Sequence, residues 1–310
     1  MADLLHLVDK PEGWTSHDAV ARLRVILGES RVGHAGTLDP FASGLLLVGE
    51  GRASGFLGCV GLLPKRYRAR ALLGVATDTQ DRTGTVIARS SRMPTVGEIE
   101  TGLESFRGSI RQRPPLYSAV KVGGTRLYKA ARRGIEVERE ERPVHVYELS
   151  IAEAALPEVT LDLTVSRGTY VRTIAHDLGA ALGCGAHLAA LRRVGSGPFQ
   201  VEAALSCDRS QGRDALAFRS RALTPGQALS FLPRARLDED EAARLCHGRA
   251  PVLNQDRIEE PKQKWALPPG ERGWPLALMA PDGTVLALAR PWEAQVPGTP
   301  VLLQRVLVGG

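Results

Sequence analysis

The segment GHAGTLDPFASG, from Gly33 to Gly44, places a single carboxylate, Asp39, among three glycines. Glycine permits backbone conformations with positive φ that side chains disfavour. Pro40 fixes its own φ and pushes Asp39 toward an extended conformation. A carboxylate held in this way is a candidate nucleophile, and an Asp-Pro turn without chemistry is the alternative.

The residues around this segment predict a strand–helix–loop–strand order. Leu4 to Val8 indicates a short strand, and the spacing of apolar residues over 17–27 predicts an amphipathic helix. Ser16 is a candidate cap for its start, and Gly28 suits its end. The apolar run Leu45 to Val48 then predicts a buried strand.

Further along the chain, periodicity predicts strands over 67–73 and 159–165 and helices over 96–106, 127–133 and 169–182, the last capped by Thr169. A domain boundary is expected near residues 230–236, and the part after it is rich in strand patterns. Asp282-Gly283 predicts a hairpin, residues 301–308 predict a last strand, and residues 255–273 predict a polar loop.

The charge of the chain is unevenly distributed. The formal net charge is +6, from 40 Lys and Arg against 34 Asp and Glu. The window from Arg107 to Arg142 holds ten basic and four acidic residues, an excess of six. A basic surface suits a polyanion such as nucleic acid. A solvated charged face remains the alternative on charge alone.

The sequence contains no pattern for a metal site, a disulfide framework or a membrane anchor. The four cysteines are Cys59, Cys184, Cys207 and Cys246, and their spacing matches no paired metal ligands. The seven histidines do not cluster. Free thiols are typical of a reducing cytosol, so a cytoplasmic location without a signal peptide is expected.

Five further segments accompany the Asp39 loop: Asp9 to Asp18, Lys65 to Arg68, Thr77 to Thr79, Arg167 to Thr173, and Gly183 to Leu188. In this order and spacing the chain resembles the bacterial tRNA pseudouridine-55 synthases, the TruB family. One tripeptide alone has little specificity, but the ordered set around a GTLDP loop is highly specific.

The resemblance implies an isomerase that converts the T-loop uridine of tRNA to pseudouridine after flipping the base out. It implies an α/β (α+β) fold, with a mixed, largely antiparallel sheet flanked by helices. The catalytic domain would span residues 1–231, with a basic insertion at about 107–142 that grips the T-arm. Residues 232–310 would form a small, β-barrel-like PUA domain that binds RNA.

The resemblance also assigns roles to single residues. Asp39 corresponds to the catalytic acid. The residues expected to contact substrate, or to support the site that does, are His34, Tyr67, Asp78, Tyr170, Arg172 and Leu191. Arg172 would pair with Asp39 and keep it ionised, because an adjacent guanidinium favours the charged carboxylate. Asp78 would belong to the same charge network. Each residue has a structural alternative: Tyr67 and Leu191 as core, and His34 as a loop hydrogen-bonder.

The family needs no cofactor and no metal, so tRNA is the expected partner of a monomer that requires no guide RNA, protein partner or membrane. A tRNA-folding chaperone would use the same surface without Asp39. Guide-dependent, dyskerin-type relatives usually lack the 107–142 insertion. A glycoside hydrolase would need a second carboxylate. One departure is Gly55, which stands where the family often has a lysine, so that Arg52 could take over a phosphate contact.

Overall fold

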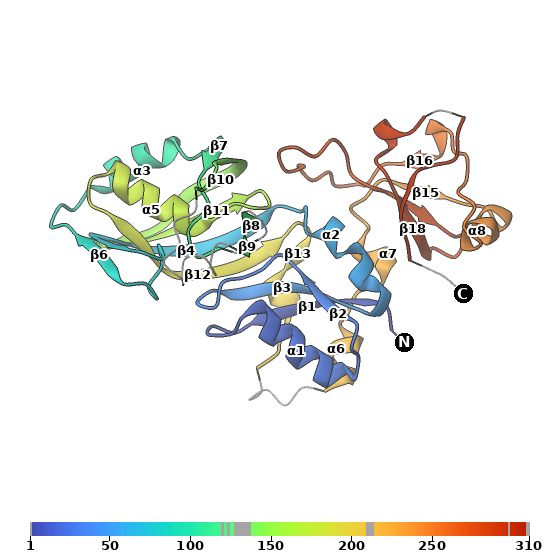
Figure 1. The fold of residues 1–310 in the computed structure, drawn as a ribbon, viewed down its shortest axis with the longest axis horizontal. Helices are drawn as coiled ribbons and strands as arrows, with labels where there is room; N and C mark the ends of the chain where they lie inside the picture. Colours follow the sequence, from blue (N-terminus) through green and yellow to red (C-terminus); the bar gives the residue numbers. More distant parts are fainter. Residues whose placement is uncertain are drawn as a thin grey trace. The chain divides into compact units, whose positions relative to one another are not determined.

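The computed structural model describes residues 2–118, 121–122, 125–126, 138–208, 214–296 and 298–307 (Figure 1). The chain divides into two compact units. The first comprises Met1–Pro40, Gly44–Pro64 and Ser196–Gly310, and the second Phe41–Ser43 and Lys65–Gly195. The expected boundary at residue 231 lies inside the first unit and stays a prediction. The expected helix over 127–133 lies outside the described residues.

The first unit contains a sheet built around its N-terminal strand. Its elements are β1 (Leu4–Lys10), α1 (Ser16–Leu27), β2 (Val32–Ala35), β3 (Ser43–Glu50), α2 (Leu57–Val60), β13 (Phe199–Gln200), β14 (Leu205–Ser206), α6 (Ala215–Ser220) and α7 (Pro225–Ala228). β1 runs antiparallel to β3, with Val8 opposite Leu46, and parallel to β14. β2 also pairs antiparallel with β3.

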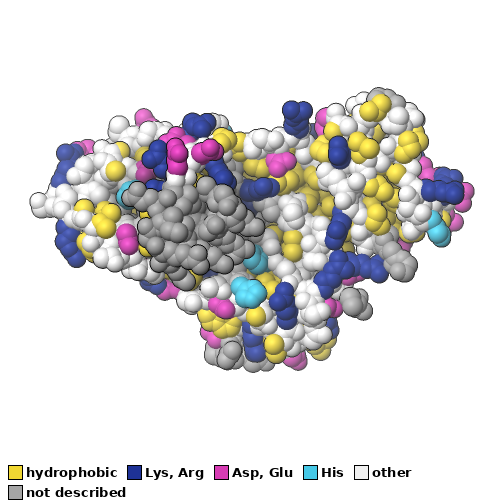
Figure 2. Space-filling model, in the orientation of Figure 1, with side chains coloured by type: hydrophobic (Ala, Val, Ile, Leu, Met, Phe, Trp, Pro, Cys, Tyr) yellow, Lys and Arg dark blue, Asp and Glu magenta, His cyan; other side chains and the backbone are white. Residues whose placement is uncertain are grey.

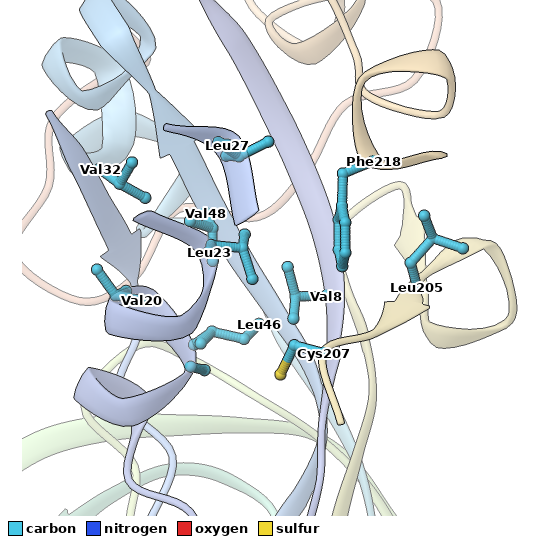
Figure 3. Packing of buried hydrophobic residues seen from close by; sticks show 11 residues of the cluster. Val8, Val20, Leu23, Leu27, Val32, Leu46, Val48, Leu205, Cys207 and Phe218 are labelled. Atoms are coloured by element: carbon cyan, nitrogen blue, oxygen red, sulfur yellow. The ribbon is translucent and has the colours of Figure 1, made fainter. Parts of the chain in front are cut away.

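Helix α1 covers one face of this sheet. Val20, Leu23 and Leu27 lie on its buried side and pack against Val8 and Leu46 (Figure 3). Burying such side chains fully contributes roughly 1.5–3 kcal/mol each. The apolar spacing seen in the sequence is therefore confirmed as the side of α1 that packs into the core of this sheet.

The two ends of α1 differ in how well the sequence predicted them. Thr15, not Ser16, is the N-cap: its side chain accepts from the Asp18 backbone N–H, and the Asp18 carboxylate accepts from Thr15 in return. Ser16 is instead the first helical residue, and its hydroxyl is directed to another segment. Gly28 ends the helix in the left-handed conformation, as expected, with φ of 64°.

The second unit contains strands in the order β12–β4–β11–β10–β7. Their bounds are β4 (Lys65–Leu73), β7 (Gly108–Gln112), β10 (Arg142–Ala155), β11 (Glu158–Val165) and β12 (Ala186–Ser196); two small hairpins are β5 (Val75–Thr77) with β6 (Val86–Arg89) and β8 (Lys121–Val122) with β9 (Thr125–Arg126). The helices among its described residues are α3 (Val96–Glu104) and α5 (Val171–Ala181). The strands expected at 67–73 and 159–165 are confirmed as neighbours β4 and β11.

Helix α5 begins without a side-chain cap. Its N-cap is Tyr170 rather than the expected Thr169. Near its other end, Gly179 packs directly on the backbone that leads into β12, because a Cβ built there would lie 2.3 Å from the Ala186 nitrogen. The close approach of helix and strand therefore requires glycine at this position.

The C-terminal part has a separate sheet and core. Its elements are β15 (Arg234–Arg236), α8 (Glu239–Cys246), β16 (Ile258–Glu259), β17 (Leu276–Met279), β18 (Val285–Ala289) and β19 (Leu303–Val306), with sheet order β16–β15–β17–β18–β19. The hairpin expected at Asp282-Gly283 joins β17 to β18, and Gly283 has φ of 86°. In the described part of the chain no pairing joins β16 to β19, so the expected barrel-like closure is not seen. Within the same described ranges, no helix has the length and apolar character needed to cross a membrane.

Candidate active site

The Asp39 loop is anchored through the residue that precedes the carboxylate. The Ser16 hydroxyl accepts a hydrogen bond from the Leu38 backbone N–H at 2.8 Å and is 3.2 Å from the Leu38 carbonyl, to which it donates. The Leu38 side chain is buried, whereas Asp39 is half-buried. Gly36 and Gly44 have φ of 79° and 104°, values that favour glycine. The first turn of α1 thus fixes the backbone that presents Asp39.

A second anchor comes from the loop between β1 and α1. The Gly13 backbone N–H donates to the Pro40 carbonyl at 2.8 Å. Lys10 is fully buried, and its ammonium donates to the carbonyls of Pro11 and Trp14 at 2.9 and 2.6 Å. A buried charge must be compensated by such partners. The loop that Lys10 stabilises therefore holds the residue that follows Asp39, while Ser16 holds the residue before it.

Three of the expected substrate contacts lie on strands. His34 lies on β2 opposite Val48, and its side chain is half-buried. Tyr67 lies on β4 opposite Leu163 and is also half-buried, so it is not a fully packed core residue. Leu191 lies on the neighbouring strand β12 and is buried. Their roles toward a substrate stay predictions.

Arg172 is held in a buried network within the second unit. Its Nη1 donates to the Asp81 carboxylate at 3.2 Å and to the Thr79 carbonyl at 2.8 Å. Its Nη2 donates to the Tyr117 carbonyl at 3.0 Å. Hydrogen bonds that involve a charged partner are stronger than neutral ones. The guanidinium at the start of α5 therefore has a fixed orientation.

Asp81, which the sequence did not single out, contacts Arg172 through one carboxylate oxygen. The expected place of Asp78 in the charge network stays a prediction. The other oxygen of Asp81 accepts from the Thr79 hydroxyl at 2.8 Å and from the Thr83 backbone N–H at 2.9 Å. Asp78 is exposed, and it accepts from the backbone N–H of Thr85. Both acids lie in the sequence TDTQD, and nothing in its spacing distinguishes them.

The turn that carries Asp81 is itself attached to β12. The Arg82 N–H donates to the Leu188 carbonyl at 2.9 Å, and the Leu188 N–H donates to the Gln80 carbonyl at 3.0 Å. Gln80 also accepts from the Thr173 hydroxyl of α5 at 2.9 Å. These contacts attach the turn that carries Asp81 both to β12 and to α5, the helix that carries Arg172.

Gln112 is a further residue at this place that the sequence did not single out. Its side-chain oxygen accepts from the Tyr170 N–H at 2.7 Å, and its amide nitrogen donates to the Tyr170 carbonyl at 2.9 Å. The side chain of Gln112, at the end of β7, is buried. A glutamine at the end of a strand carries no sequence signal for such a role. It fixes the backbone of Tyr170, the N-cap residue of α5, two residues before Arg172.

Lys65, at the start of β4, is a buried lysine with a strong electrostatic perturbation. Burial, together with repulsion from Arg193 and Arg167, lowers its pKa to about 7. Desolvation disfavours the charged ammonium, and like charges add to this effect. Lys65 can therefore change its protonation state close to neutral pH.

Two family models match the chain in sequence. Residues 24–171 match the N-terminal domain of the TruB family pseudouridylate synthases, and residues 172–217 match the tRNA pseudouridylate synthase B C-terminal domain. The first match includes Asp39 and Asp81, and the second begins at Arg172. The chain belongs to the TruB family. It is therefore an isomerase that converts uridine of tRNA to pseudouridine.

Curated relatives extend this match over nearly the whole TruB chain. The tRNA pseudouridine synthase B of Geobacter sulfurreducens is 43% identical over 285 residues and covers 91% of each chain. The protein of the same name from Thermobifida fusca is 43% identical over 298 residues, with 93% and 94% covered.

Solved structures agree on the mixed α/β pseudouridine synthase fold. A chain of a Cbf5–Nop10–Gar1 complex has a TM-score of 0.72 at 29% identity and covers 99% of this chain and 85% of that one. A chain of an H/ACA RNP bound to a substrate RNA that contains 2′-deoxyuridine has a TM-score of 0.69 at 26% identity, with 98% and 85% covered.

The space beside Gly55, where the resemblance led us to expect a lysine, is filled from another segment. A Cβ built on Gly55 would lie 2.9 Å from the Arg305 Nε and 3.4 Å from a methyl group of Leu307. A side chain at residue 55 would therefore have to displace the side chain of Arg305. A cation is thus present beside this position although residue 55 itself carries none.

Proposed function

We propose that this chain isomerises uridine 55 in the tRNA T-loop and that Asp39 is the nucleophile. The observation that supports this most directly is the anchoring of the Asp39 loop, in which Ser16 engages both backbone polar groups of Leu38. A group that attacks a substrate must be held close to its reacting geometry. The Gly13 contact with Pro40 holds the residue on the other side of the carboxylate, so the backbone of Asp39 is fixed from both sides.

The reaction balances without any added reagent. The bond between N1 of the base and C1′ of the ribose breaks, the base turns, and a bond forms between C5 and C1′. C5 loses its proton, and N1 ends with a proton, so the product is an isomer of uridine. A carboxylate nucleophile splits one difficult step into easier ones.

The remaining residues would extract and hold the base. A uridine inside a folded T-loop must be flipped out, which costs a few kcal/mol. We assign stacking on the base to Tyr67 and Tyr170, because a base on an aromatic face returns about 1–3 kcal/mol. His34 would hold the displaced loop, and Leu191 would line the pocket of the base.

A neighbouring positive charge would keep the Asp39 carboxylate ionised. We assign this effect to Arg172, whose orientation is fixed by its contacts with Thr79, Asp81 and Tyr117. We assign to Asp81 the place in this network that the family resemblance gave to Asp78, because the Asp81 carboxylate contacts the guanidinium. An ionised carboxylate is the form that can attack.

Binding of tRNA would use two further parts of the chain. We assign contacts with the T-arm backbone to the basic residues of 107–142, because lysine and arginine neutralise phosphates. Residues 232–310 would form a PUA-like RNA-binding domain. The catalytic domain would span residues 1–231 and act as a monomer without guide RNA or protein partner.

The test uses the purified chain and an unmodified tRNA transcript, with pseudouridine mapped by carbodiimide-blocked reverse transcription. We expect one stop in the T-loop at position 55, and we expect Asp39→Asn to abolish it while tRNA binding is kept. A pure RNA chaperone would show no stop with either protein. A stop elsewhere, or a stop that survives Asp39→Asn, would refute the assignment.

A further inference from the structure

A small pocket lies in the C-terminal part of the chain, apart from the residues assigned to isomerisation. It has a volume of about 250 Å³ and is lined by Phe231, Trp265, Trp274 and Trp292, among others. Three of the four tryptophans of the chain therefore surround one cavity. Trp265 and Trp274 come from the long segment between β16 and β17, and Trp292 follows β18.

The aromatic rings have defined positions. Phe231 and Trp274 meet edge to face, with centroids 5.3 Å apart and planes at 79°. The indole N–H of Trp274 donates to the Trp265 carbonyl at 3.0 Å, so the polar atom of this ring is satisfied within the protein. The three tryptophans are only half-buried, so ring surface remains accessible. Figure 2 shows other apolar side chains at the surface of the C-terminal part.

The wall beside Trp292 depends on a glycine. A Cβ on Gly273 would lie 2.6 Å from the Pro291 Cβ and 2.8 Å from a carboxylate oxygen of Glu293. The chain before Trp274 therefore packs directly on the segment that carries Trp292 and Glu293. This contact joins two segments of the pocket that are about twenty residues apart in sequence.

Charged side chains complete the lining. Glu260 and Glu293 supply carboxylates, and Lys264 and Arg272 supply cations. The Lys264 ammonium lies 3.1 Å from the Glu260 carboxylate, and both side chains are largely exposed. Carboxylates accept hydrogen bonds from exocyclic amino groups of bases, and cations bind phosphate. Aromatic faces, acceptors and cations together are what a single nucleotide requires.

The volume of the pocket and the RNA substrate of the family restrict which ligand the pocket can hold. Sites for drug-sized ligands have about 300–1,000 Å³, so this pocket suits one ring system. The family reaction supplies a polynucleotide, and proteins bind unpaired bases by stacking them on aromatic side chains. We propose that this pocket binds one unpaired nucleobase of the tRNA, outside the uridine that reacts, and prefers a base that carries an exocyclic amino group.

The first test is tryptophan fluorescence in the full chain with Trp14→Phe, in which every remaining tryptophan lines the pocket. The probes are single-stranded oligocytidylate and oligouridylate of equal length, with a proline-rich peptide as the alternative ligand. We expect saturable quenching that is stronger for oligocytidylate. No quenching, equal quenching by both RNAs, or quenching by the peptide alone would each overturn the proposal.

The second test measures tRNA binding and turnover of Trp292→Ala and Glu293→Gln. Loss of one stacked base should raise the Kd for tRNA of Trp292→Ala roughly five- to 150-fold, with kcat at saturating tRNA unchanged. Glu293→Gln, which keeps the size of the side chain, should reduce the preference for oligocytidylate. Val296→Ala, an exposed change nearby, is the control. An unchanged Kd in Trp292→Ala overturns this proposal, whereas loss of kcat in Asp39→Asn tests the isomerase site separately.

Discussion

Arg172 and Asp81, which are 91 residues apart in sequence, form an ion pair at 3.2 Å with only 3% and 5% of their side chains exposed. The pair joins the start of α5 to the turn after β5, and its carboxylate is held further by Thr79 and Thr83. Breaking a buried pair by removing one partner costs about 3–5 kcal/mol, because the other charge is left without compensation. The pair therefore supports both the fold and the proposed site.

Asp81→Asn should lower the free energy of unfolding by several kcal/mol, on the order of the cost of breaking a buried pair, and should reduce pseudouridine formation. Urea unfolding and a tritium-release assay would measure the two effects. The control is Asp78→Asn, because Asp78 is exposed and accepts from the backbone N–H of Thr85. Equal losses of stability and activity in both variants would show that the ion pair of Asp81 with Arg172 contributes no more than the exposed Asp78 does.

Ser16→Ala should lower kcat, because the Leu38 backbone loses the hydroxyl that fixes it beside Asp39. An unsatisfied buried N–H also costs about 1–3 kcal/mol of stability. Thr15→Ala provides a matched control, since it removes the cap of the same helix at a cost of about 0.5–2 kcal/mol without touching Leu38. We expect Ser16→Thr to restore activity. If Thr15→Ala lowers kcat as much as Ser16→Ala does, the hydroxyl is not a specific anchor.

Gln112→Met should lower kcat more than it raises KM, because the side chain keeps its length but can no longer hold the Tyr170 backbone. The effect on stability should be about 1–3 kcal/mol, the cost of leaving the Tyr170 N–H without Gln112, because the Tyr170 carbonyl still accepts from Thr173 and Ile174. Steady-state kinetics on tRNA transcripts would separate kcat from KM. Ser109→Ala, an exposed change on the same strand, should leave both unchanged. A pure KM effect would place Gln112 in tRNA binding instead.

His6 makes the stability of the first unit depend on pH. Its Nε2 lies 2.8 Å from the Glu50 carboxylate, and both side chains are buried. Burial, which outweighs the opposing effect of Glu50, lowers the pKa of His6 below 6.5 in the folded state. Between that lowered pKa and 6.5, the unfolded chain binds more protons than the folded chain, so stability falls as the pH falls.

Urea unfolding at pH 8, 6.5 and 5 would measure this dependence. We expect the contribution of His6 to the free energy of unfolding to be complete above pH 6.5 and to decrease below it. His6→Gln should flatten the curve, whereas His17→Gln, an exposed change, should leave its shape unchanged. A wild-type chain that gains stability on acidification to pH 5, with no such gain in His6→Gln, would contradict the expected direction.

Gly179→Ala should destabilise the protein although alanine favours helices by about 1 kcal/mol over glycine. The added Cβ would lie 2.3 Å from the Ala186 nitrogen, and a backbone atom cannot move aside as a side chain can. Overpacking of this kind typically costs about 1–3 kcal/mol. Gly97→Ala, in α3 with no atom within 4 Å, should be neutral or stabilising. Thermal unfolding should show a lower midpoint for Gly179→Ala alone, and a similar loss in both variants would rule out the close packing as the cause.

The sequence predicted elements that depend on local pattern. The alternating residues of β4 and β11, the apolar side of α1 and the hairpin at Asp282-Gly283 needed only periodicity and turn chemistry. The helix caps were harder to predict from the sequence. Thr15 and Ser16 are adjacent residues with hydroxyl side chains, and only the fold shows that Thr15 caps α1 while Ser16 binds Leu38.

Hydrogen-bond and ion-pair partners that are far apart in sequence could not be predicted from the sequence. Asp78 and Asp81 lie in the same short acidic motif, and the choice between them depends on where α5 places Arg172. Gln112 was missed for the same reason, because its partner Tyr170 is 58 residues away. The motifs of the family identified the reaction, whereas the contacts that support its residues required the structure.

The two hydrogen bonds between the Ser16 hydroxyl and the Leu38 backbone also restrict which residues evolution can place at position 16. A single oxygen atom accepts from the N–H and donates to the carbonyl of one residue, so neither an ammonium group nor a hydrocarbon of the same size can replace it. Substitution at residue 16 should thus be restricted to serine and threonine, while its neighbour Thr15 can drift among many capping residues.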